Sequence, residues 1–429
     1  MNEIKTFFQQ IIKRNPFGDY QIEPSKYLAE NRNVILRMPT GSGKSESILC
    51  AYLWALKQNP SFPQQMLYGL PMRNLANSLG ERFARYQKNF NGLGIAIQHG
   101  ERKGTPTLSS DIAVATIDQL ISAYACTPLG HSVRGGNIPA GAVASAFLVF
   151  DEVHTFDPLR ALQSTLFIVE HSHKIGLPFA FLSATLPDSF IEILEKQFNA
   201  KTINVDEKDI PRRANRHVKM INQLDRMLTP TEIFNAWAAL KEGSLLVVCN
   251  TVKYAKDLWQ EVSSTLKDNP VHLLHSEFTA EDRKEKEKEG GILNQLLGEK
   301  PTKRGIVITT QVVEVGLDVS TGLLLTQLAP VDALIQRAGR VARWGGDGEI
   351  RVFNIENARP YPTELVTATR KTLDKPEIWL TWEREQKLVN TVLGPVFTDY
   401  LKSEKRAEAS YWLGEGSFSG KRSEVSKAI

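Results

Sequence analysis

The chain has 429 residues, more than one hydrophobic core usually serves, so its length predicts two or three domains. Hydrophobic residues make up 42% and charged residues 23%, as is typical of a soluble globular protein. Three cysteines without CxxC spacing exclude a disulfide framework or a cysteine zinc cluster and favour a reducing, cytoplasmic location. No run approaches the roughly 20 apolar residues of a membrane span. The formal charge of +4 permits a nucleic-acid partner without arguing for one, because a basic groove can be local.

The first half of the chain has a helical start at residues 1–30 and then alternates short apolar runs with amphipathic stretches. This alternation predicts a parallel, doubly wound α/β sheet. We expect residues 1–210 to form this first domain. The expected strands are 34–38, 65–71, 111–116, 146–152 and 179–185.

The charged, proline-containing segment 204–216 is expected to be a linker, and the alternation restarts after it. A second α/β domain is therefore expected over residues 211–355. Residues 356–429 predict a short, mainly helical C-terminal extension, whose last twenty or so residues are expected to be poorly ordered. The strands expected in this half are 244–250, 271–276, 305–310, 323–328 and 350–354.

The segment MPTGSGKS, residues 38–45, is the most specific local signal. It lies between an expected strand and an expected helix, which is the context that a phosphate-binding loop needs. Glycines let the backbone turn its N–H groups toward an anion, and the helix adds its positive N-terminal end. Lys44 is expected to reach the β- and γ-phosphates of ATP, and Ser45 to bind Mg²⁺; the alternative is a glycine-rich turn without a ligand. The other expected nucleotide-binding residues of the loop are Thr40, Gly41, Ser42 and Gly43.

An acidic pair ends the expected strand AFLVFDE, residues 146–152. Asp151 follows five apolar or small residues, so it should emerge at the carboxyl end of a core strand and hold Mg²⁺ through water. Glu152 is then placed to orient and polarise the water that attacks the γ-phosphate. Phosphoryl transfer depends mainly on such positioning and on charge neutralisation.

These motifs, in this order, resemble superfamily 2 DExH helicases over roughly residues 20–345. The resemblance implies two tandem RecA-like domains and a motor powered by ATP. It implies that Gln21 reads the adenine, with a plain surface glutamine as the alternative. Arg73 in LPMRNLANSL and Thr116 in VATIDQLI match two motifs that grip the nucleic-acid strand.

Two further motifs of the first half resemble the parts of this family that couple hydrolysis to unwinding. One is DEVH, in which His154 is expected to be a coupling residue. The other is the SAT motif, in which Ser183 and Thr185 are assigned the same role by the resemblance.

In the second half, TTQVVEVGLDVS and QLAPVDALIQRAGRVARWG match the family's remaining motifs. By resemblance Thr310 touches the track's phosphates and Asp318 helps to link the lobes around the nucleotide. Gln336 is expected near the attacking water. Arg340 and Arg343 are expected to reach the γ-phosphate from the second domain, so that hydrolysis depends on domain closure. Arg337 is expected to be structural.

The residues of the motifs, including PTGSGKSE, DEVHTFDP and HSEF, most resemble those of the CRISPR-associated helicase of type I interference. That family implies a 3′ to 5′ translocase on single-stranded DNA, recruited by an RNA-guided surveillance complex. Glu277 departs from the family, where an arginine is frequent. Because the phosphate loop begins at residue 38 and no histidine precedes an aspartate, we expect no HD-type nuclease domain and a separate nuclease chain or subunit.

Two alternatives remain open at this stage. One is a DExH RNA helicase, because residues alone do not separate DNA from RNA as the track. The other is an ATP-binding switch subunit that changes shape without translocation. The presence of Glu152 together with Arg340 and Arg343 argues against the switch, which does not need catalytic residues.

Overall fold

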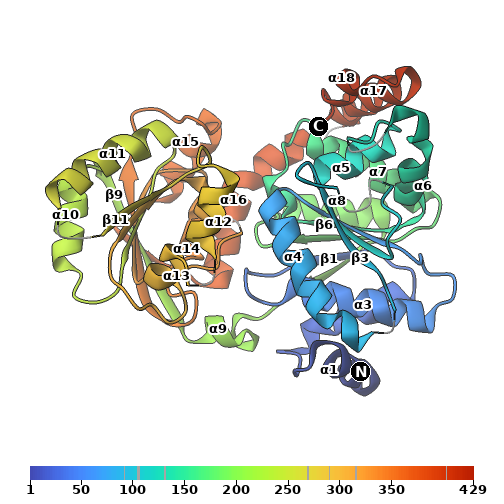
Figure 1. The fold of residues 1–429 in the computed structure, drawn as a ribbon, viewed down its shortest axis with the longest axis horizontal. Coiled ribbons are helices and arrows are strands. Elements are labelled where there is room, and N and C mark those ends of the chain that lie inside the picture. Colours follow the sequence, from blue (N-terminus) through green and yellow to red (C-terminus); the bar gives the residue numbers. More distant parts are fainter. Residues whose placement is uncertain are drawn as a thin grey trace. The chain divides into compact units, whose positions relative to one another are not determined.

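The computed structural model describes residues 1–90, 92–103, 107–129, 132–267, 270–288, 290–314, 316–401 and 403–429. They form two compact units, one of residues 1–209 with 394–429 and the other of residues 210–393. Each unit is built on one mainly parallel sheet with helices between its strands (Figure 1). The predicted fold class of two tandem, doubly wound α/β domains is confirmed.

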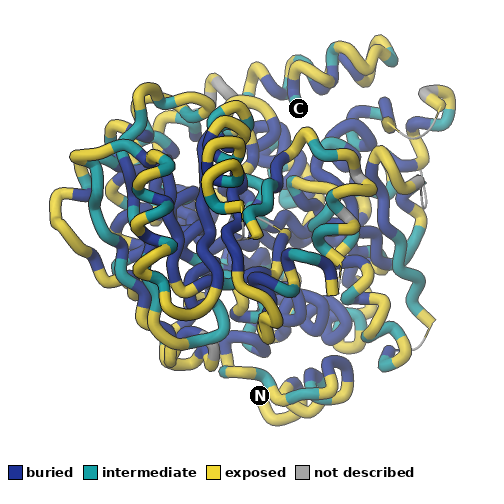
Figure 2. Tube along the Cα trace, turned by 60° about the vertical axis from the view of Figure 1, so that its left-hand side comes forward, coloured by how far each residue is buried: buried dark blue, intermediate teal, exposed yellow. Residues whose placement is uncertain are grey.

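The first unit has an eight-stranded sheet in the order β4-β3-β5-β2-β6-β7-β1-β8. All neighbouring strands run parallel except β3 and β4. The central strands are buried along their whole length, because helices cover both faces of such a sheet. Figure 2 shows buried residues in dark blue in the interior and exposed residues in yellow on the outside. The strands are β1 Val34–Arg37, β2 Met66–Leu70, β3 Ile95–His99, β4 Arg102–Lys103, β5 Ile112–Thr116, β6 Phe147–Asp151, β7 Phe179–Ser183 and β8 Lys201–Asn204.

The helices of the first unit connect these strands in the expected alternation. The N-terminal helix α1 packs against α3, where the Phe7 and Trp54 rings meet edge to face at 5.3 Å (Figure 1). The main helices are α1 Asn2–Ile12, α2 Glu23–Ala29, α3 Lys44–Gln58, α4 Arg73–Tyr86, α5 Ile117–Tyr124, α6 Asn137–Ser145, α7 Ala161–Lys174 and α8 Asp188–Phe198.

The second unit has a seven-stranded sheet in the order β11-β12-β10-β13-β14-β9-β15, in which only the β15–β9 pair is antiparallel. Leu245, Val247, Ile306, Ile308 and Leu325 form the centre of its core. Its strands are β9 Arg216–Met227, β10 Leu245–Val248, β11 Val271–Leu274, β12 Ile306–Thr309, β13 Leu323–Gln327, β14 Gly346–Asn354 and β15 Glu377–Trp379. Its helices are α9 Pro211–Ala214, α10 Pro230–Ala239, α11 Val252–Thr265, α12 Ala280–Glu287, α13 Ile292–Leu297, α14 Val331–Ala338 and α15 Thr363–Thr372.

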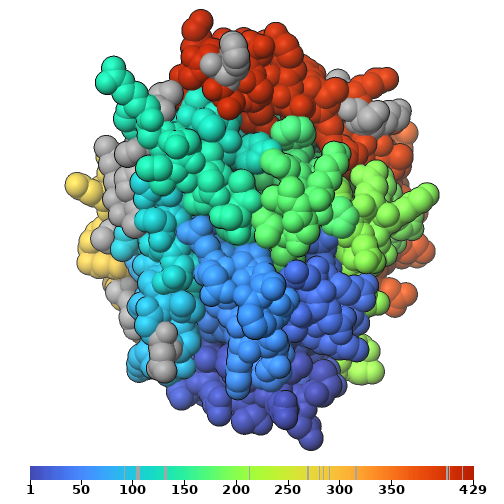
Figure 3. Space-filling view, turned by 90° about the vertical axis from the view of Figure 1, so that its right-hand side faces the viewer, coloured from blue at the N-terminus to red at the C-terminus, as the bar shows by residue number. Residues whose placement is uncertain are grey.

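The C-terminal segment expected as one extension, residues 356–429, is divided between the two units. Helix α16, Trp382–Tyr400, contains the division, which falls between Leu393 and Gly394. After it, α17 (Ser403–Ser419) and α18 (Arg422–Val425) pack on the first unit, and α17 contacts α7 (Figure 3, red).

The expectation of a poorly ordered C-terminus is wrong. The last residues are tied to the first unit by hydrogen bonds: the Ser164 hydroxyl donates to the Ala428 carbonyl at 2.6 Å, and Arg422 donates to the Pro128 carbonyl at 2.6 Å. Ala428 is fully buried. Polar composition favours disorder only where the backbone lacks partners, and here the first unit supplies them.

Candidate nucleotide-binding site

The phosphate loop joins β1 to α3 in the first unit, as predicted. Gly41 and Gly43 adopt left-handed backbone conformations, with φ of 85° and 81°. A Cβ added at Gly43 would lie 2.2 Å from Nε2 of Gln21, so only glycine fits there. The loop therefore combines a tight turn with the N-terminus of a 15-residue helix, the arrangement that binds phosphate.

The polar side chains of the loop are buried. Lys44 is 7% exposed, and its Nζ donates to the Met38 carbonyl at 3.1 Å, across the turn. The Ser42 hydroxyl is buried without a hydrogen-bond partner among the described residues. Ser45 is also buried, whereas Thr40, at the start of the turn, is half-buried.

Asp151 ends β6 at the carboxyl edge of the same sheet, as predicted. Its carboxylate accepts hydrogen bonds from the Tyr68 hydroxyl at 2.7 Å and from the Glu152 N–H at 2.9 Å. Burial, followed by repulsion from Glu152, raises the pKa of Asp151 to about 6, and the nearby charge of Lys44 opposes the rise. The loop lysine and the acidic motif are thus close enough to interact electrostatically.

Glu152 has a left-handed backbone, with φ of 53°, which a residue with a side chain rarely adopts. This backbone conformation makes the chain turn sharply after β6. Atom Oε2 of its carboxylate lies 3.6 Å from Nδ1 of His154 and has no hydrogen-bond partner among the described residues. Backbone strain of this kind is common at functional sites.

The structure brings the DEVH and SAT motifs together. Nδ1 of His154 lies 2.8 Å from the Ser183 hydroxyl, and the Thr185 N–H donates to that same hydroxyl at 3.1 Å. The Thr185 hydroxyl is buried and has no partner in the described part of the chain. The acidic motif and the end of β7 are therefore joined through one serine.

Gln21 supports the phosphate loop through hydrogen bonds to its backbone. Its Nε2 donates to the carbonyls of Ser42 at 3.1 Å and Gly43 at 3.2 Å. Its Oε1 accepts from Arg14 at 3.2 Å and from the Phe17 N–H at 2.7 Å. The side chain is fully buried and uses both of its polar atoms, so the alternative of a plain surface glutamine is wrong. The predicted contact with adenine would have to replace one of these bonds.

The residues predicted to grip the track lie in both units. Arg73, the first residue of α4, is exposed and forms an ion pair with Glu101 at 2.7 Å. Thr116 ends β5 opposite Leu70 of β2, at the same carboxyl edge as the phosphate loop. Thr310 follows β12 in the second unit and is buried.

Arg337 is the largest fully buried side chain among the described residues, which agrees with the expectation of a structural role. Its guanidinium donates to Glu314 at 2.8 Å, to the Thr326 hydroxyl at 2.7 Å and to the Tyr361 hydroxyl at 2.8 Å. Burial raises the pKa of Glu314, and the charge of Arg337 opposes that rise. This pair ties α14 to the chain segment that follows β12.

Replacing Arg337 by methionine is expected to lower the free energy of unfolding by about 3–5 kcal/mol, because it leaves Glu314 buried without its counter-charge. Urea unfolding measures the loss. Arg226→Met, at an exposed arginine that forms ion pairs with Asp225 and Glu232, is the control and should lower stability much less, because surface ion pairs contribute little. Equal stability of the two variants would contradict the structural role of Arg337.

The two predicted arginine fingers differ in their surroundings. Arg340 is 3% exposed, and its guanidinium donates to the carbonyls of Leu317 and Glu314, both at 2.6 Å. Arg343 is more accessible and donates to Asp318 at 2.7 Å. Gln336 lies buried on α14. The structure thus groups Asp318 with Arg343 inside the second unit.

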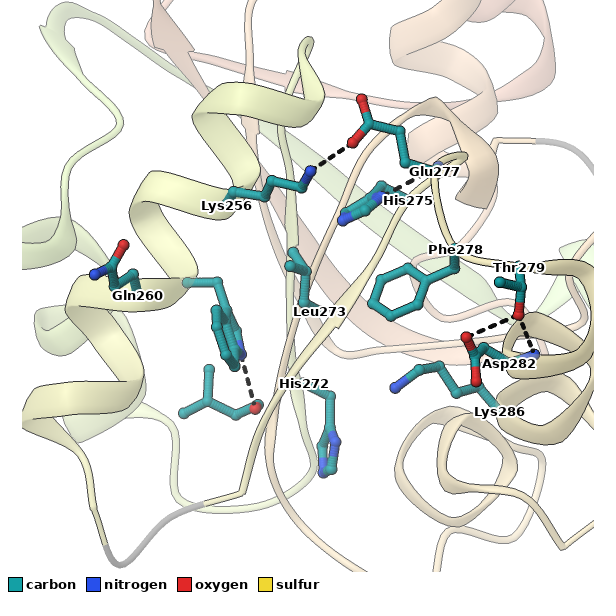
Figure 4. A pocket seen from close by; sticks show the side chains of 12 residues that line it. Lys256, Gln260, His272, Leu273, His275, Glu277, Phe278, Thr279, Asp282 and Lys286 are labelled. Atoms are coloured by element: carbon teal, nitrogen blue, oxygen red, sulfur yellow. Dashed lines mark hydrogen bonds and ion pairs between the residues drawn. The ribbon is translucent and has the colours of Figure 1, made fainter.

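A cavity of about 680 Å³ lies in the second unit between α11 and α12, beside the edge strand β11 (Figure 4). Trp259, His272 and Phe278 line it, together with Lys256 and Lys286 at its rim. Glu277, the departure in HSEF, is exposed and forms an ion pair with Lys256. The negative charge of Glu277 is therefore paired with Lys256 of the same unit.

Over the residues that the structure describes, no group of three or more His, Cys, Asp or Glu is placed to hold a metal ion. The two residues predicted to hold Mg²⁺ lie near one side chain, because the Tyr68 hydroxyl donates to Asp151 and Ser45 is close enough to affect the pKa of Tyr68. Hydroxyl and carboxylate oxygens suit Mg²⁺, which keeps several waters when it binds with a nucleotide. Among the described residues, no helix has both the length and the apolar character that crossing a membrane requires.

Two residues that contact the loop and the acidic motif were not predicted from the sequence. Tyr68 reaches Asp151 from β2, and Tyr20 donates to the Ser42 carbonyl at 3.1 Å. Tyr68 lies in the apolar strand MLYGL, in which its hydroxyl is the one polar side-chain group. A buried tyrosine needs a hydrogen-bond partner, and that signal could have marked it.

Comparison with known proteins identifies relatives over most of the chain. The family described as DEAD/DEAH box helicase matches residues 19–193, and the family described as CRISPR-associated nuclease/helicase Cas3, C-terminal, matches residues 241–345. The CRISPR-associated helicase Cas3 of Thermoproteus tenax is 28% identical over 401 residues, which cover 89% of this chain and 66% of the relative.

Solved structures share the fold at lower identity. The crystal structure of T. fusca Cas3 with ATP has a TM-score of 0.72 and 20% identity, over 99% of this chain and 56% of that one. A chain in a structure described as a CRISPR RNA-guided surveillance complex, pre-nicking, has a TM-score of 0.64 and 20% identity, over 95% of this chain and 54% of that one. This chain thus spans between about half and two thirds of the length of these proteins.

Proposed function

Because the chain belongs to the DEAD/DEAH-box helicases of the CRISPR-associated Cas3 type, we propose that it hydrolyses ATP to move 3′ to 5′ along single-stranded DNA in type I antiviral defence. The observation that carries the proposal is the meeting of the phosphate loop and the acidic motif at one edge of the first sheet. There Lys44 acts electrostatically on Asp151, and the Tyr68 hydroxyl donates to Asp151.

Each of these residues has a role in the proposed reaction. The loop N–H groups and Lys44 would hold the phosphates, and Ser45 and Asp151 would hold Mg²⁺, Asp151 through water. The metal ion, when bound, would neutralise phosphate charge. Glu152 would orient the attacking water with the carboxylate oxygen that has no hydrogen-bond partner among the described residues.

The second unit completes the proposed site when ATP draws the units together. Gln336 approaches the water, and Arg340 and Arg343 stabilise the charge that develops on the γ-phosphate. Both arginines are held within their own unit, Arg340 by two carbonyls and Arg343 by Asp318. Exchange of these partners for phosphate oxygens would couple hydrolysis to domain motion.

We propose that the hydrogen bond between His154 and Ser183 transmits the structural change caused by ATP hydrolysis. A change at Glu152 alters the position of His154, and Ser183 passes that change to Thr185 at the end of β7. Arg73, Thr116 and Thr310 are the proposed contacts with the phosphates of the DNA strand.

Unwinding of tailed duplexes tests the proposal. Duplex DNA with a 3′ single-stranded tail should be unwound with ATP, whereas the same duplex with a 5′ tail should not. Unwinding from the 5′ tail would contradict the direction. ATP turnover without unwinding of either DNA would favour a switch subunit over a motor.

Binding to single-stranded DNA should weaken steeply with salt, because the strand is held mainly through its phosphates. Between about 50 and 200 mM salt, a loss of affinity on the order of 10³ is expected for such a grip. Fluorescence anisotropy with a labelled oligonucleotide measures it. An affinity that hardly changes over this range would contradict a phosphate grip.

The proposed partners are an RNA-guided surveillance complex and a separate nuclease chain or subunit. A structure described as such a complex contains a chain of the same fold. None of the eight histidines in the sequence is followed by aspartate, as an HD-type nuclease would require. The purified chain should therefore leave single-stranded DNA intact with Mg²⁺ or Mn²⁺, and cutting would contradict the separate nuclease.

A further inference from the structure

Tyr68 lies near the centre of the first sheet, and its hydroxyl donates at 2.7 Å to Oδ2 of Asp151, one of the two residues proposed to hold Mg²⁺. The other residue, Ser45, lies close enough to this hydroxyl to oppose the rise that burial causes in the pKa of Tyr68. The Tyr68 side chain is fully buried, and its ring meets the Phe83 ring edge to face at 5.8 Å. The ring is therefore fixed by packing, while the hydroxyl joins strand β2 to strand β6.

The sheet register explains how Tyr68 reaches this place. Tyr68 stands opposite Val149 on the neighbouring parallel strand β6, and Asp151 follows two residues later on the same face. Two residues of strand cover about 6.7 Å. The long axis of a tyrosine spans such a distance, whereas serine or threonine would stop short and phenylalanine would lack the polar atom.

We propose that Tyr68 is a positioning residue that holds the Asp151 carboxylate, beside Ser45, in the orientation that nucleotide-bound Mg²⁺ requires. The inference rests on the proposed ATP site and adds a residue to it. Tyr68 is not proposed to touch nucleotide or metal. It acts through the Asp151 side chain, to which its hydroxyl donates.

The physical argument is one of preorganisation. Mg²⁺ demands a near-octahedral arrangement of oxygens, so ligands that are free to rotate bind it less well. Supporting hydrogen bonds to ligating side chains typically change metal affinity by about 10–100-fold. The bond from Tyr68 fixes one rotamer of Asp151, the side chain that is proposed to hold Mg²⁺ through water.

Tyr68→Phe removes the hydroxyl and keeps the ring that packs against Phe83, so the variant is expected to fold. Tyr52→Phe is the matched control. The Tyr52 hydroxyl is equally buried within the first unit and donates to the Gln64 carbonyl at 2.7 Å, but it belongs to a different hydrogen-bond pair. Both substitutions remove one buried hydroxyl and one hydrogen bond.

The measurement is binding of a fluorescent ATP analogue by the full chain, first in EDTA and then over a titration of Mg²⁺. For Tyr68→Phe, the Mg²⁺ concentration at half-saturation should rise about tenfold or more, while the affinity in EDTA stays within about twofold. Tyr52→Phe should match the wild type in both. A double variant, Tyr68→Phe with Asp151→Asn, should show less than the sum of the two single effects on Mg²⁺ binding.

An unchanged Mg²⁺ half-saturation in Tyr68→Phe, with a melting temperature lowered as in Tyr52→Phe, would overturn the inference and leave the proposed function standing. Fully additive effects in the double variant would also overturn it. If the wild-type chain itself bound no nucleotide with Mg²⁺, the proposed function would fail, and this inference with it.

Discussion

Lys44→Ala is expected to lower ATP hydrolysis by roughly three orders of magnitude, to the background of the assay. The lysine is the charge that the loop aims at the β- and γ-phosphates, and its Nζ is already turned across the loop toward the Met38 carbonyl. Alanine keeps the helix, because it is the best helix former, but it removes the charge. Turnover is measured as phosphate release with Mg²⁺ and single-stranded DNA.

Lys57→Ala is the control for this variant. Lys57 lies on the same helix α3 but near its end, and it is exposed. It should hydrolyse ATP at the wild-type rate. Normal turnover in Lys44→Ala would refute the assignment of residues 38–45 as the phosphate site, because no other lysine of that loop could replace it.

Arg340→Ala is expected to spare ATP binding and to lower hydrolysis on the order of 10³, as for other arginine fingers. The structure adds a second effect. Arg340 is buried and satisfies the carbonyls of Leu317 and Glu314, so its loss leaves two buried acceptors unpaired. Each unpaired acceptor costs about 1–3 kcal/mol. Activity must therefore be read together with stability.

Arg343→Ala separates the two effects. Arg343 is more accessible and its side chain pairs with the exposed Asp318, so its loss should change the melting temperature little. It should nevertheless lower hydrolysis by a comparable factor if both arginines reach the γ-phosphate. Single-turnover hydrolysis and nucleotide affinity are measured for both variants. Weaker ATP binding with an unchanged rate of hydrolysis would contradict the finger role.

The buried strands were predicted more accurately than the edges of the sheets. Parallel strands covered on both faces are continuous apolar runs, and β1, β2, β5, β6 and β7 all begin and end within one or two residues of the predicted ranges. Strand β9, Arg216–Met227, which lies next to the short edge strand β15, was missed. Only part of it is buried, and it carries charges such as Lys219 and Asp225, so it lacks the continuous apolar run that marks the central strands.

The candidate site was predicted in its parts, and the structure adds how they meet. The loop at Lys44 and the carboxylate of Asp151 are marked by motifs whose spacing depends on a strand and a helix. The hydrogen bond of Tyr68 depends on the pairing of two strands 83 residues apart in sequence, which no local pattern reveals. The burial of Arg340 likewise depends on the segment after β12 folding back over it.

The central claim is that the chain is an ATP-driven motor on single-stranded DNA. The most direct measurement is ATP hydrolysis by the purified chain with Mg²⁺, alone and with single-stranded DNA or RNA of the same sequence. The account predicts strong stimulation by DNA that Glu152→Gln abolishes. Stronger stimulation by RNA would instead identify an RNA helicase, and hydrolysis that neither strand stimulates would contradict a motor that acts on its own.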